Sequence, residues 1–522
     1  MKYSLSNLPH IHINLCRLLA GFFLVGILPS IAIASTQAMT ASGIVEGEDL
    51  KGIVRFLGVP YAQPPLGRMR WKAAQDAEPW SGVRETKAYG DACSQIGGFF
   101  ASDDDSTFDK RFGSEDCLYL NVWTPVEDED SRWQSPRPVL VFIHGGSGIT
   151  GAASLPFYDG ERLARELNAV VVTFNYRLGI FSMLRSVILN GKDPATKRGS
   201  LGLLDQIKAL DWVKTNIRAF GGNPDEVTLM GHSAGSIFVW ALMRSSLASG
   251  YFQRAVSLSG VPYDRKTMSI RKLRRKLYQD KKDDEAAVSD EEFEEALNQQ
   301  DEDRRDTYVS DLTDEQVLAK TSAVAKLDSE ALEDEEAVFV NAVPTLMGTV
   351  GNETSMIRIF DYSRLSTMEF WLLVNSLRND LKSTDFVRKY RQRAFFRKTE
   401  KLNKKEEILM ASLADELVKL GMPVYRYQFN WQNYPEPWST LLGAYHAIDV
   451  PVLFGNFDIG RPNFTRFTWT EDNVEEREAL HRDLVTGLKG FIEVGDPNLY
   501  VESAGEPVWP QWDSRALFKT FQ

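Results

Sequence analysis

Short apolar runs recur along the chain, and several of them end in a loop rich in glycine or polar residues. Residues 138–143, 227–230, 343–348 and 424–429 are such runs, and their length and content of β-branched or aromatic side chains predict buried strands. The run 237–242 follows a tight glycine turn and predicts a helix. Buried strands combined with helices favour an α/β fold, in which functional residues lie on loops at the ends of strands.

One of these loops has the features of a nucleophile turn. Residues 231–235 are Gly-His-Ser-Ala-Gly, between the predicted strand and the predicted helix. A serine at the apex of such a turn has its hydroxyl directed away from the sheet, and the flanking Gly231 and Gly235 let neighbouring backbone pass closely. A match of five residues also occurs in ordinary glycine turns, but the strand before it and the helix after it favour the functional interpretation. Ser233 is therefore the predicted nucleophile.

A serine hydroxyl needs a base to remove its proton, and the chain has six histidines. His446 is the predicted base, because it lies in a loop shortly after the strand 424–429. The other histidines suit other roles: His10 and His12 lie in a predicted targeting segment, His144 opens a glycine loop, His232 sits on the turn itself, and His481 lies on a charged amphipathic helix where we expect a solvated side chain.

The base needs an acid that orients it. Many carboxylates lie between Ser233 and His446, so chain order alone selects none of them. Glu353 is the predicted acid, because residues 349–354 form the loop at the end of the buried strand 343–348. Asp449, three residues after His446, stays open as an alternative.

A second glycine loop supplies backbone N–H groups. Residues 144–148, His-Gly-Gly-Ser-Gly, directly follow the strand 138–143. We expect the N–H groups of Gly146 and Ser147, with that of Ala234 after the nucleophile, to form an oxyanion hole. A phosphate-binding loop is the other use of such a segment, but neither of the common phosphate-loop patterns is present.

Ordered motifs over roughly residues 43–515 resemble the type-B carboxylesterases, which include cholinesterases and para-nitrobenzyl esterases. They lie at residues 56–62, 64–71, 115–123, 175–179, 202–206, 220–224, 231–235, 495–498 and 509–510. The resemblance implies an α/β-hydrolase fold with a large, mostly parallel central sheet flanked by helices, and hydrolysis of carboxylic esters without a cofactor or metal. It also implies Ser233, Glu353 and His446 as nucleophile, acid and base, a Cys93–Cys117 disulfide, and an ion pair between Arg70 and Glu115.

Three positions depart from the pattern of that family. His232 stands where a glutamate is usual, and Ser147 stands where a third glycine is common. Residues 106–109 lack the tryptophan with which cholinesterases stack choline, so a quaternary-ammonium substrate is not supported; Phe108 offers a weaker cation-binding face.

The N-terminus predicts export. Lys2 and Arg17 precede an apolar run, residues 18–33, and an Ala-Ile-Ala site ends at Ala34. This pattern favours a signal peptide over residues 1–34, cleaved after Ala34, rather than a membrane anchor. We therefore expect a secreted or periplasmic protein, an oxidising location in which a disulfide is stable.

The mature chain, residues 35–522, is predicted to be a single catalytic domain, because the motifs continue along its whole length. Removal of the leader changes the formal net charge from −12 to −14, which disfavours nucleic acid and anionic lipid as partners. No later apolar run is long enough to span a membrane. The sequence does not indicate whether the protein is a monomer or an oligomer. Residues 264–336 are dense in charged residues and predict a helical insertion, either a cap over the site or a solvated face.

The predicted function is a secreted serine carboxylesterase acting on a small ester. Two alternatives stay open. One is a catalytically inactive binding or adhesion protein of the same fold, and the other is a lipase, lactonase or amidase that uses the same three residues.

Overall fold

The computed structural model describes residues 36–126, 135–183, 200–262, 311, 338–356, 392–436, 438–457, 465, 468–501, 508–513 and 517–522. The predicted signal peptide, residues 1–34, and the predicted charged insertion, residues 264–336 apart from Asp311, lie outside the described residues.

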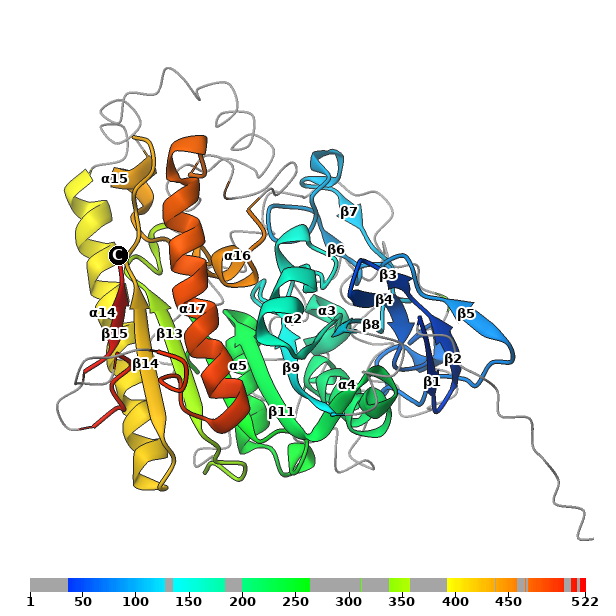
Figure 1. Cartoon of the computed structure of the whole chain (residues 1–522). Coiled ribbons are helices and arrows are strands. Elements are labelled where there is room, and N and C mark those ends of the chain that lie inside the picture. Colours follow the sequence, from blue (N-terminus) through cyan, green and yellow to red (C-terminus); the bar gives the residue numbers. More distant parts are fainter. Residues whose placement is uncertain are drawn as a thin grey trace, which may run out of the picture.

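A ten-stranded sheet forms the centre of the structure (Figure 1). In spatial order its strands are β15 (Lys519–Phe521), β14 (Val424–Phe429), β13 (Thr345–Val350), β12 (Arg254–Leu258), β11 (Gly222–His232), β9 (Arg137–Ile143), β10 (Val170–Phe174), β8 (Tyr119–Pro125), β4 (Ile53–Pro60) and β3 (Glu48–Asp49). The strands from β15 to β10 are parallel, whereas β8, β4 and β3 join by antiparallel pairing. The predicted mostly parallel sheet is confirmed.

Two small sheets and a set of helices surround this centre. The small sheets contain β1 (Gln37–Thr40), β2 (Gly43–Glu46) and β5 (Val83–Glu85), and β6 (Gln95–Ile96) and β7 (Arg111–Phe112). The α-helices are α2 (Glu161–Leu167), α3 (Gly179–Met183), α4 (Leu201–Asn216), α5 (Ala234–Arg244), α14 (Gln392–Lys419), α15 (Trp438–Leu442), α16 (Asp449–Phe454) and α17 (Val474–Val494). Short 3₁₀ helices are η1 (Gly67–Met69), η2 (Asp105–Thr107), η3 (Pro156–Tyr158), η5 (Ile217–Phe220), η6 (Ser246–Ala248) and η8 (Glu471–Asn473).

The sheet separates two apolar cores, because successive side chains of a strand point to opposite faces. On β9, Leu140 and Phe142 belong to the core that includes side chains of α16 and α17, whereas Val139 and Val141 belong to the core that includes α4 and α5. Helices therefore cover both faces. Strands such as β10 and β13 are buried along their whole length for this reason, and their sequences do not alternate between apolar and polar residues.

The polar loops predicted to carry chemistry meet at one edge of the sheet. Because β9, β11 and β13 are parallel, their carboxyl ends lie on the same side. The glycine loop follows β9, Ser233 follows β11, and the loop of Glu353 follows β13. His446 reaches this edge from the segment between α15 and α16.

His481 is not a solvated surface residue, so that expectation is wrong. It lies fully buried on α17, with Nδ1 2.7 Å from the carbonyl oxygen of Val452 and Nε2 2.7 Å from Oε2 of Glu166. The helical pattern marked it as polar, but packing of α17 against α2 and α16 supplies polar partners inside the fold.

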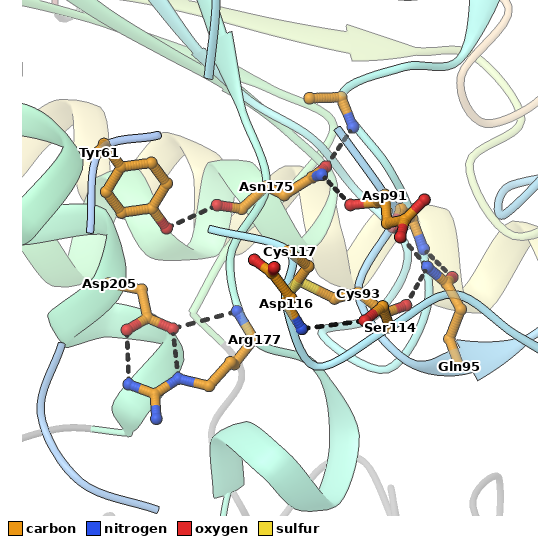
Figure 2. Close-up of a disulfide and its surroundings, with 12 residues drawn as sticks. Tyr61, Asp91, Cys93, Gln95, Ser114, Asp116, Cys117, Asn175, Arg177 and Asp205 are labelled. Carbon is orange, nitrogen blue, oxygen red and sulfur yellow. Dashed lines mark hydrogen bonds and ion pairs between the residues drawn. A yellow bond between two sulfur atoms is a disulfide. The ribbon is translucent and has the colours of Figure 1, made fainter. Parts of the chain in front are cut away.

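The disulfide between Cys93 and Cys117 is present, with a sequence separation of 24 residues (Figure 2). Near it, the buried Arg177 forms an ion pair with Asp205, with 2.7 Å between Nε and Oδ2. The ion pair implied by the resemblance is also present and buried, with 2.7 Å between Nε of Arg70 and Oε2 of Glu115.

Membrane spanning has no support in the described part of the chain, where every helix is too short or too polar to cross a bilayer.

Candidate active site

The turn after β11 holds Ser233 in a conformation that few serines adopt. Ser233 has φ 56° and ψ −117°, at the N-cap of α5. The turn is possible because its flanks are glycines: a Cβ on Gly231 would lie 2.3 Å from the carbonyl oxygen of Gly235, and one on Gly235 would lie 2.1 Å from that of Ile143. Strain of this kind is kept where surrounding structure enforces it, and it directs the serine side chain away from the sheet.

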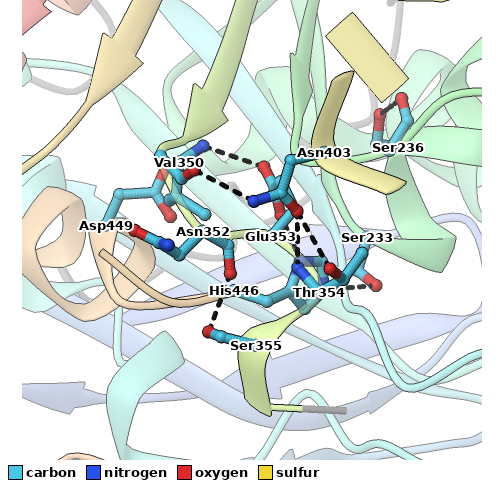
Figure 3. Close-up of polar contacts among 12 residues, drawn as sticks. Ser233, Ser236, Val350, Asn352, Glu353, Thr354, Ser355, Asn403, His446 and Asp449 are labelled. Carbon is cyan, nitrogen blue, oxygen red and sulfur yellow. Dashed lines mark hydrogen bonds and ion pairs between the residues drawn. The ribbon is translucent and has the colours of Figure 1, made fainter. Parts of the chain in front are cut away.

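Three side chains from separate parts of the sequence form a continuous chain of hydrogen bonds (Figure 3). Nε2 of His446 lies 2.8 Å from Oγ of Ser233, and Nδ1 lies 2.6 Å from Oε2 of Glu353. The Glu353 side chain is 4% exposed and that of His446 is 14% exposed. Because Nδ1 faces a carboxylate, it carries the ring proton, and Nε2 accepts the hydrogen bond from the Ser233 hydroxyl.

Glu353 is held by the loop that it belongs to and by a neighbouring helix. Its Oε1 accepts a hydrogen bond of 2.8 Å from the Val350 N–H, which fixes the carboxylate plane. Asn403 on α14 accepts from Thr354 N at 3.1 Å and donates to the carbonyl of Gly351 at 3.2 Å, so it holds both sides of the loop (Figure 3). No motif indicated Asn403, because one polar residue in a charged helical pattern carries no signal.

Asp449, the alternative acid, makes a different contact. It is 1% exposed, and its Oδ2 accepts a hydrogen bond of 2.8 Å from the Tyr427 hydroxyl. Burial, and then the charge of Glu353, raise the pKa of Asp449 to about 6. Nδ1 of His446 therefore donates its hydrogen bond to Glu353, and Asp449 is a second buried acid nearby.

A further acid beside Glu353 was not predicted. Glu406 on α14 is 8% exposed, and burial together with the charge of Glu353 raises its pKa well above the usual value. A residue of this kind cannot be recognised from sequence, since α14 contains many glutamates and only packing decides which one turns inward.

The glycine loop after β9 passes close to the nucleophile turn. A Cβ on Gly145 would lie 3.0 Å from the carbonyl oxygen of His232 and 3.1 Å from Cβ of Ser233. Gly146 has φ 108° and accepts a hydrogen bond of 3.0 Å from Thr150 N, so the loop turns back on itself. Ser147 takes a left-handed φ of 59°, which explains why glycine suits this position.

The N–H groups expected to face an oxyanion are not engaged in hydrogen bonds within the described part of the chain. Within the described residues, no acceptor pairs with the N–H of Gly146, Ser147 or Ala234. Ala234 is the first residue of α5, where the first N–H groups of a helix have no partner inside the helix. Free N–H groups of this kind can bind a developing negative charge.

The histidines that were set aside lie close by and are buried. His144 stacks on Tyr176 with 4.4 Å between ring centroids, its Nδ1 lies 2.8 Å from the Gly145 carbonyl oxygen, and burial lowers its pKa to about 4. His232 packs against His446, with 4.8 Å between ring centroids. The hydrogen bond to Oγ of Ser233 is made by His446.

Comparison with known proteins gives the family. A model of the "Carboxylesterase family" matches residues 34–519. The chain belongs to the carboxylesterase family. A para-nitrobenzyl esterase of Bacillus subtilis is 32% identical over 481 residues, covering 88% of this chain and 90% of the relative. Carboxylesterase 1C of Rattus norvegicus is also 32% identical, covering 88% and 84% of the two chains.

Solved structures agree with this assignment. The crystal structure of a carboxylesterase from Geobacillus stearothermophilus matches with a TM-score of 0.66 and 27% identity, covering 93% of this chain and 96% of that one. A thermophilic para-nitrobenzyl esterase matches with a TM-score of 0.65 and 25% identity, covering 92% and 94%. The expected α/β-hydrolase fold and the expected carboxylic ester hydrolase are therefore confirmed.

Proposed function

We propose that this carboxylesterase works through a triad of Ser233, His446 and Glu353, with the N–H groups of Gly146, Ser147 and Ala234 as its oxyanion hole. The observation that carries the proposal is the unbroken series of contacts from Glu353 through His446 to Ser233, at 2.6 Å and 2.8 Å. A serine with a base and an orienting acid at these distances is equipped for acyl transfer.

In the first half of the reaction, Oγ of Ser233 bonds to the ester carbonyl carbon while its proton moves to Nε2 of His446. The carbonyl oxygen becomes an oxyanion, which the free N–H groups stabilise. As the intermediate collapses, the bond from carbon to the alcohol oxygen breaks, and the proton on Nε2 passes to the departing alcohol. An acyl-enzyme remains on Ser233.

In the second half, water replaces the alcohol. Nε2 of His446 takes one proton of the water, and the water oxygen bonds to the acyl carbon. The carbon–Oγ bond then breaks, and the proton returns to Oγ, which releases the carboxylic acid and restores the enzyme. Glu353 keeps the Nδ1 proton in place throughout and stabilises the imidazolium that forms in each half.

The test is hydrolysis of p-nitrophenyl esters from acetyl to palmitoyl by the mature chain. Ser233→Ala is expected to lower kcat on the order of 10⁴-fold or more, because no other group in the site replaces the nucleophile. Ser246→Ala, an exposed serine beyond α5, is the matched control and should keep the activity of the unmodified protein. Loss of labelling by a fluorophosphonate in Ser233→Ala, with labelling kept in Ser246→Ala, would also support Ser233 as the nucleophile.

Retention of most turnover by Ser233→Ala would overturn the triad. Absence of turnover in the unmodified protein on every ester would favour the inactive binding protein. A maximum at long acyl chains would leave the triad intact and assign a lipase-type preference.

We further propose that residues 1–34 are a signal peptide and that the mature protein is secreted or periplasmic. The Cys93–Cys117 disulfide supports this, since such bonds persist in oxidising compartments. N-terminal sequencing of the exported protein should begin at Ser35, and a chain that starts at Met1 inside the cell would refute the proposal.

A further inference from the structure

His232 occupies a position at the active site in which its own hydrogen bonds are missing. It is the last residue of β11, directly before Ser233, and is 2% exposed. Both ring nitrogens are buried, and neither has a hydrogen-bond partner among the described residues. A buried polar group without a partner weakens a fold. Hydrogen bonds to the described residues therefore do not explain the position of this side chain, and its packing contacts are what it offers to the site.

What His232 does contact is the ring of His446. The two ring centroids are 4.8 Å apart and the ring planes meet at 37°. On another side His232 borders the glycine loop, since a Cβ on Gly145 would lie 3.0 Å from Nδ1 of His232. The ring of His232 thus lies against both the base and the loop that carries the predicted oxyanion donors.

His446 needs such a contact, because its hydrogen bonds leave one motion free. Its two partners, Ser233 and Glu353, bind opposite ring nitrogens. These two hydrogen bonds fix the positions of the two ring nitrogens but restrain rotation of the ring plane about the line through them only weakly. The Nε2 lone pair points off that line, so such a rotation turns it away from Oγ of Ser233, and proton transfer depends on that alignment. A side chain packed against the ring limits the rotation.

We propose that His232 is a positioning residue for His446, supplying a flat, uncharged wall that fixes the tilt of the catalytic imidazole. The inference rests on the proposed triad. It concerns the residue before the nucleophile, where the family usually has glutamate, and it assigns this histidine a geometric role in place of a charge.

The His232 ring must stay uncharged for the proposed mechanism to operate. Burial, and then the charge of His446, hold the pKa of His232 well below its usual value. Of the described titratable groups, His446 is the one that acts on His232, and the neighbouring Gly145 and Ser233 carry no charge. Only one of the two rings therefore becomes cationic, and the imidazolium of His446 meets no second positive charge.

The first test separates the contribution of the flat ring shape to kcat from the contribution of the ring nitrogens. His232→Ala should lower kcat for p-nitrophenyl acetate by about 10-fold to 100-fold with KM changed by less than about 3-fold, because orientation of the base is lost while substrate binding is kept. His232→Phe keeps a flat ring and should recover kcat to within about 5-fold of the unmodified enzyme. Leu242→Ala, which empties a fully buried site on α5, is the matched control and should lower the thermal midpoint without this loss of kcat.

The second test asks whether neutrality matters. His232→Glu places a negative charge beside His446 and should move the acid limb of kcat/KM upward by about one pH unit, because the charge favours the imidazolium. His232→Gln, the neutral match of similar size, should leave the limb where it is.

Each outcome decides a different point. Equal loss of kcat in His232→Ala and Leu242→Ala would reduce His232 to a packing residue and overturn the inference. Equal loss in His232→Ala and His232→Phe would show that the nitrogens matter, and would also overturn it. If His232→Ala does not fold, the test rests on kcat of His232→Phe and on the acid limb of kcat/KM in His232→Gln and His232→Glu. Retention of turnover by Ser233→Ala would remove the proposed function itself, which none of the His232 variants can do.

Discussion

Replacement of Glu353 by glutamine tests the triad more sharply than removal of the side chain, because glutamine keeps the size and changes only the hydrogen bonds. The Val350 N–H donates to Oε1 of Glu353 at 2.8 Å, so that position requires an acceptor. The glutamine oxygen will take it. The glutamine NH₂ group then lies where Oε2 stood, 2.6 Å from Nδ1 of His446. Since NH₂ donates, Nδ1 must accept, and the ring proton moves to Nε2.

A proton on Nε2 disables the base that faces Ser233. We expect Glu353→Gln to lower kcat by about 10⁴-fold, the size expected when a catalytic histidine is held in the wrong tautomer, with little change in KM. That loss corresponds to about 5.5 kcal/mol of transition-state stabilisation. The opposite amide orientation offers little escape, because it would bring the NH₂ group against the Val350 N–H and leave two buried donors unsatisfied, at a cost of about 1–3 kcal/mol for each donor, which together is comparable to that loss.

The assay is steady-state hydrolysis of p-nitrophenyl acetate from pH 5 to pH 9, with circular dichroism to verify folding. Asp449→Asn is the matched control, since it converts another buried acid of this region to an amide, and its kcat should fall by less than about 10-fold because that carboxylate accepts a hydrogen bond from Tyr427 instead of His446. A folded Glu353→Gln that keeps more than a tenth of kcat, or an Asp449→Asn that loses more than Glu353→Gln, would refute the reasoning.

Three other predictions follow from the same structure. Burial raises the pKa of Asp449 from 3.8 to about 6, so the folded state loses stability as pH rises between these two values, and the loss is complete above about pH 6. Asp449→Asn should therefore gain up to about 3 kcal/mol in urea unfolding at pH 7.5 and little at pH 4, and an equal gain at both pH values would contradict this. Replacement of Cys93 and Cys117 by serine opens a loop with a sequence separation of 24 and should lower the free energy of unfolding by about 3 kcal/mol. We expect a lower thermal midpoint that reductant no longer changes, and a midpoint equal to that of the disulfide form would argue against the bond. Gly146→Ala places a Cβ 1.9 Å from the Thr150 carbonyl oxygen, so the loop must shift and move the oxyanion donors. We expect kcat to fall by about 10²-fold to 10³-fold, whereas a fully active variant would exclude this loop from the site.

Local sequence patterns were sufficient to predict part of the candidate site. The nucleophile turn is encoded within a few residues, because a strand, two glycines and a helix enforce the geometry of Ser233. The glycine loop was recognisable for the same reason. Strand boundaries were less exact: β11 begins at Gly222 and β13 ends at Val350, because pairing with neighbouring strands extends an element beyond its most apolar stretch.

Long-range contacts were beyond the reach of patterns. Chain order and loop position favoured Glu353, but only the fold brings its carboxylate to Nδ1 of His446 across 93 positions of sequence. The burial of His481 and the inward turn of Glu406 likewise depend on which helices pack together, since a helical pattern specifies a polar residue and not the partner opposite it.

The sequence by itself determined the buried strands, the serine turn and the family, because the signals for these are carried by residues close together along the chain. The tertiary structure alone decided which acid meets the base, how the His232 ring lies on His446, and which polar groups are buried. Those features depend on distances between segments far apart in sequence, and only the packing of both faces of the sheet sets them.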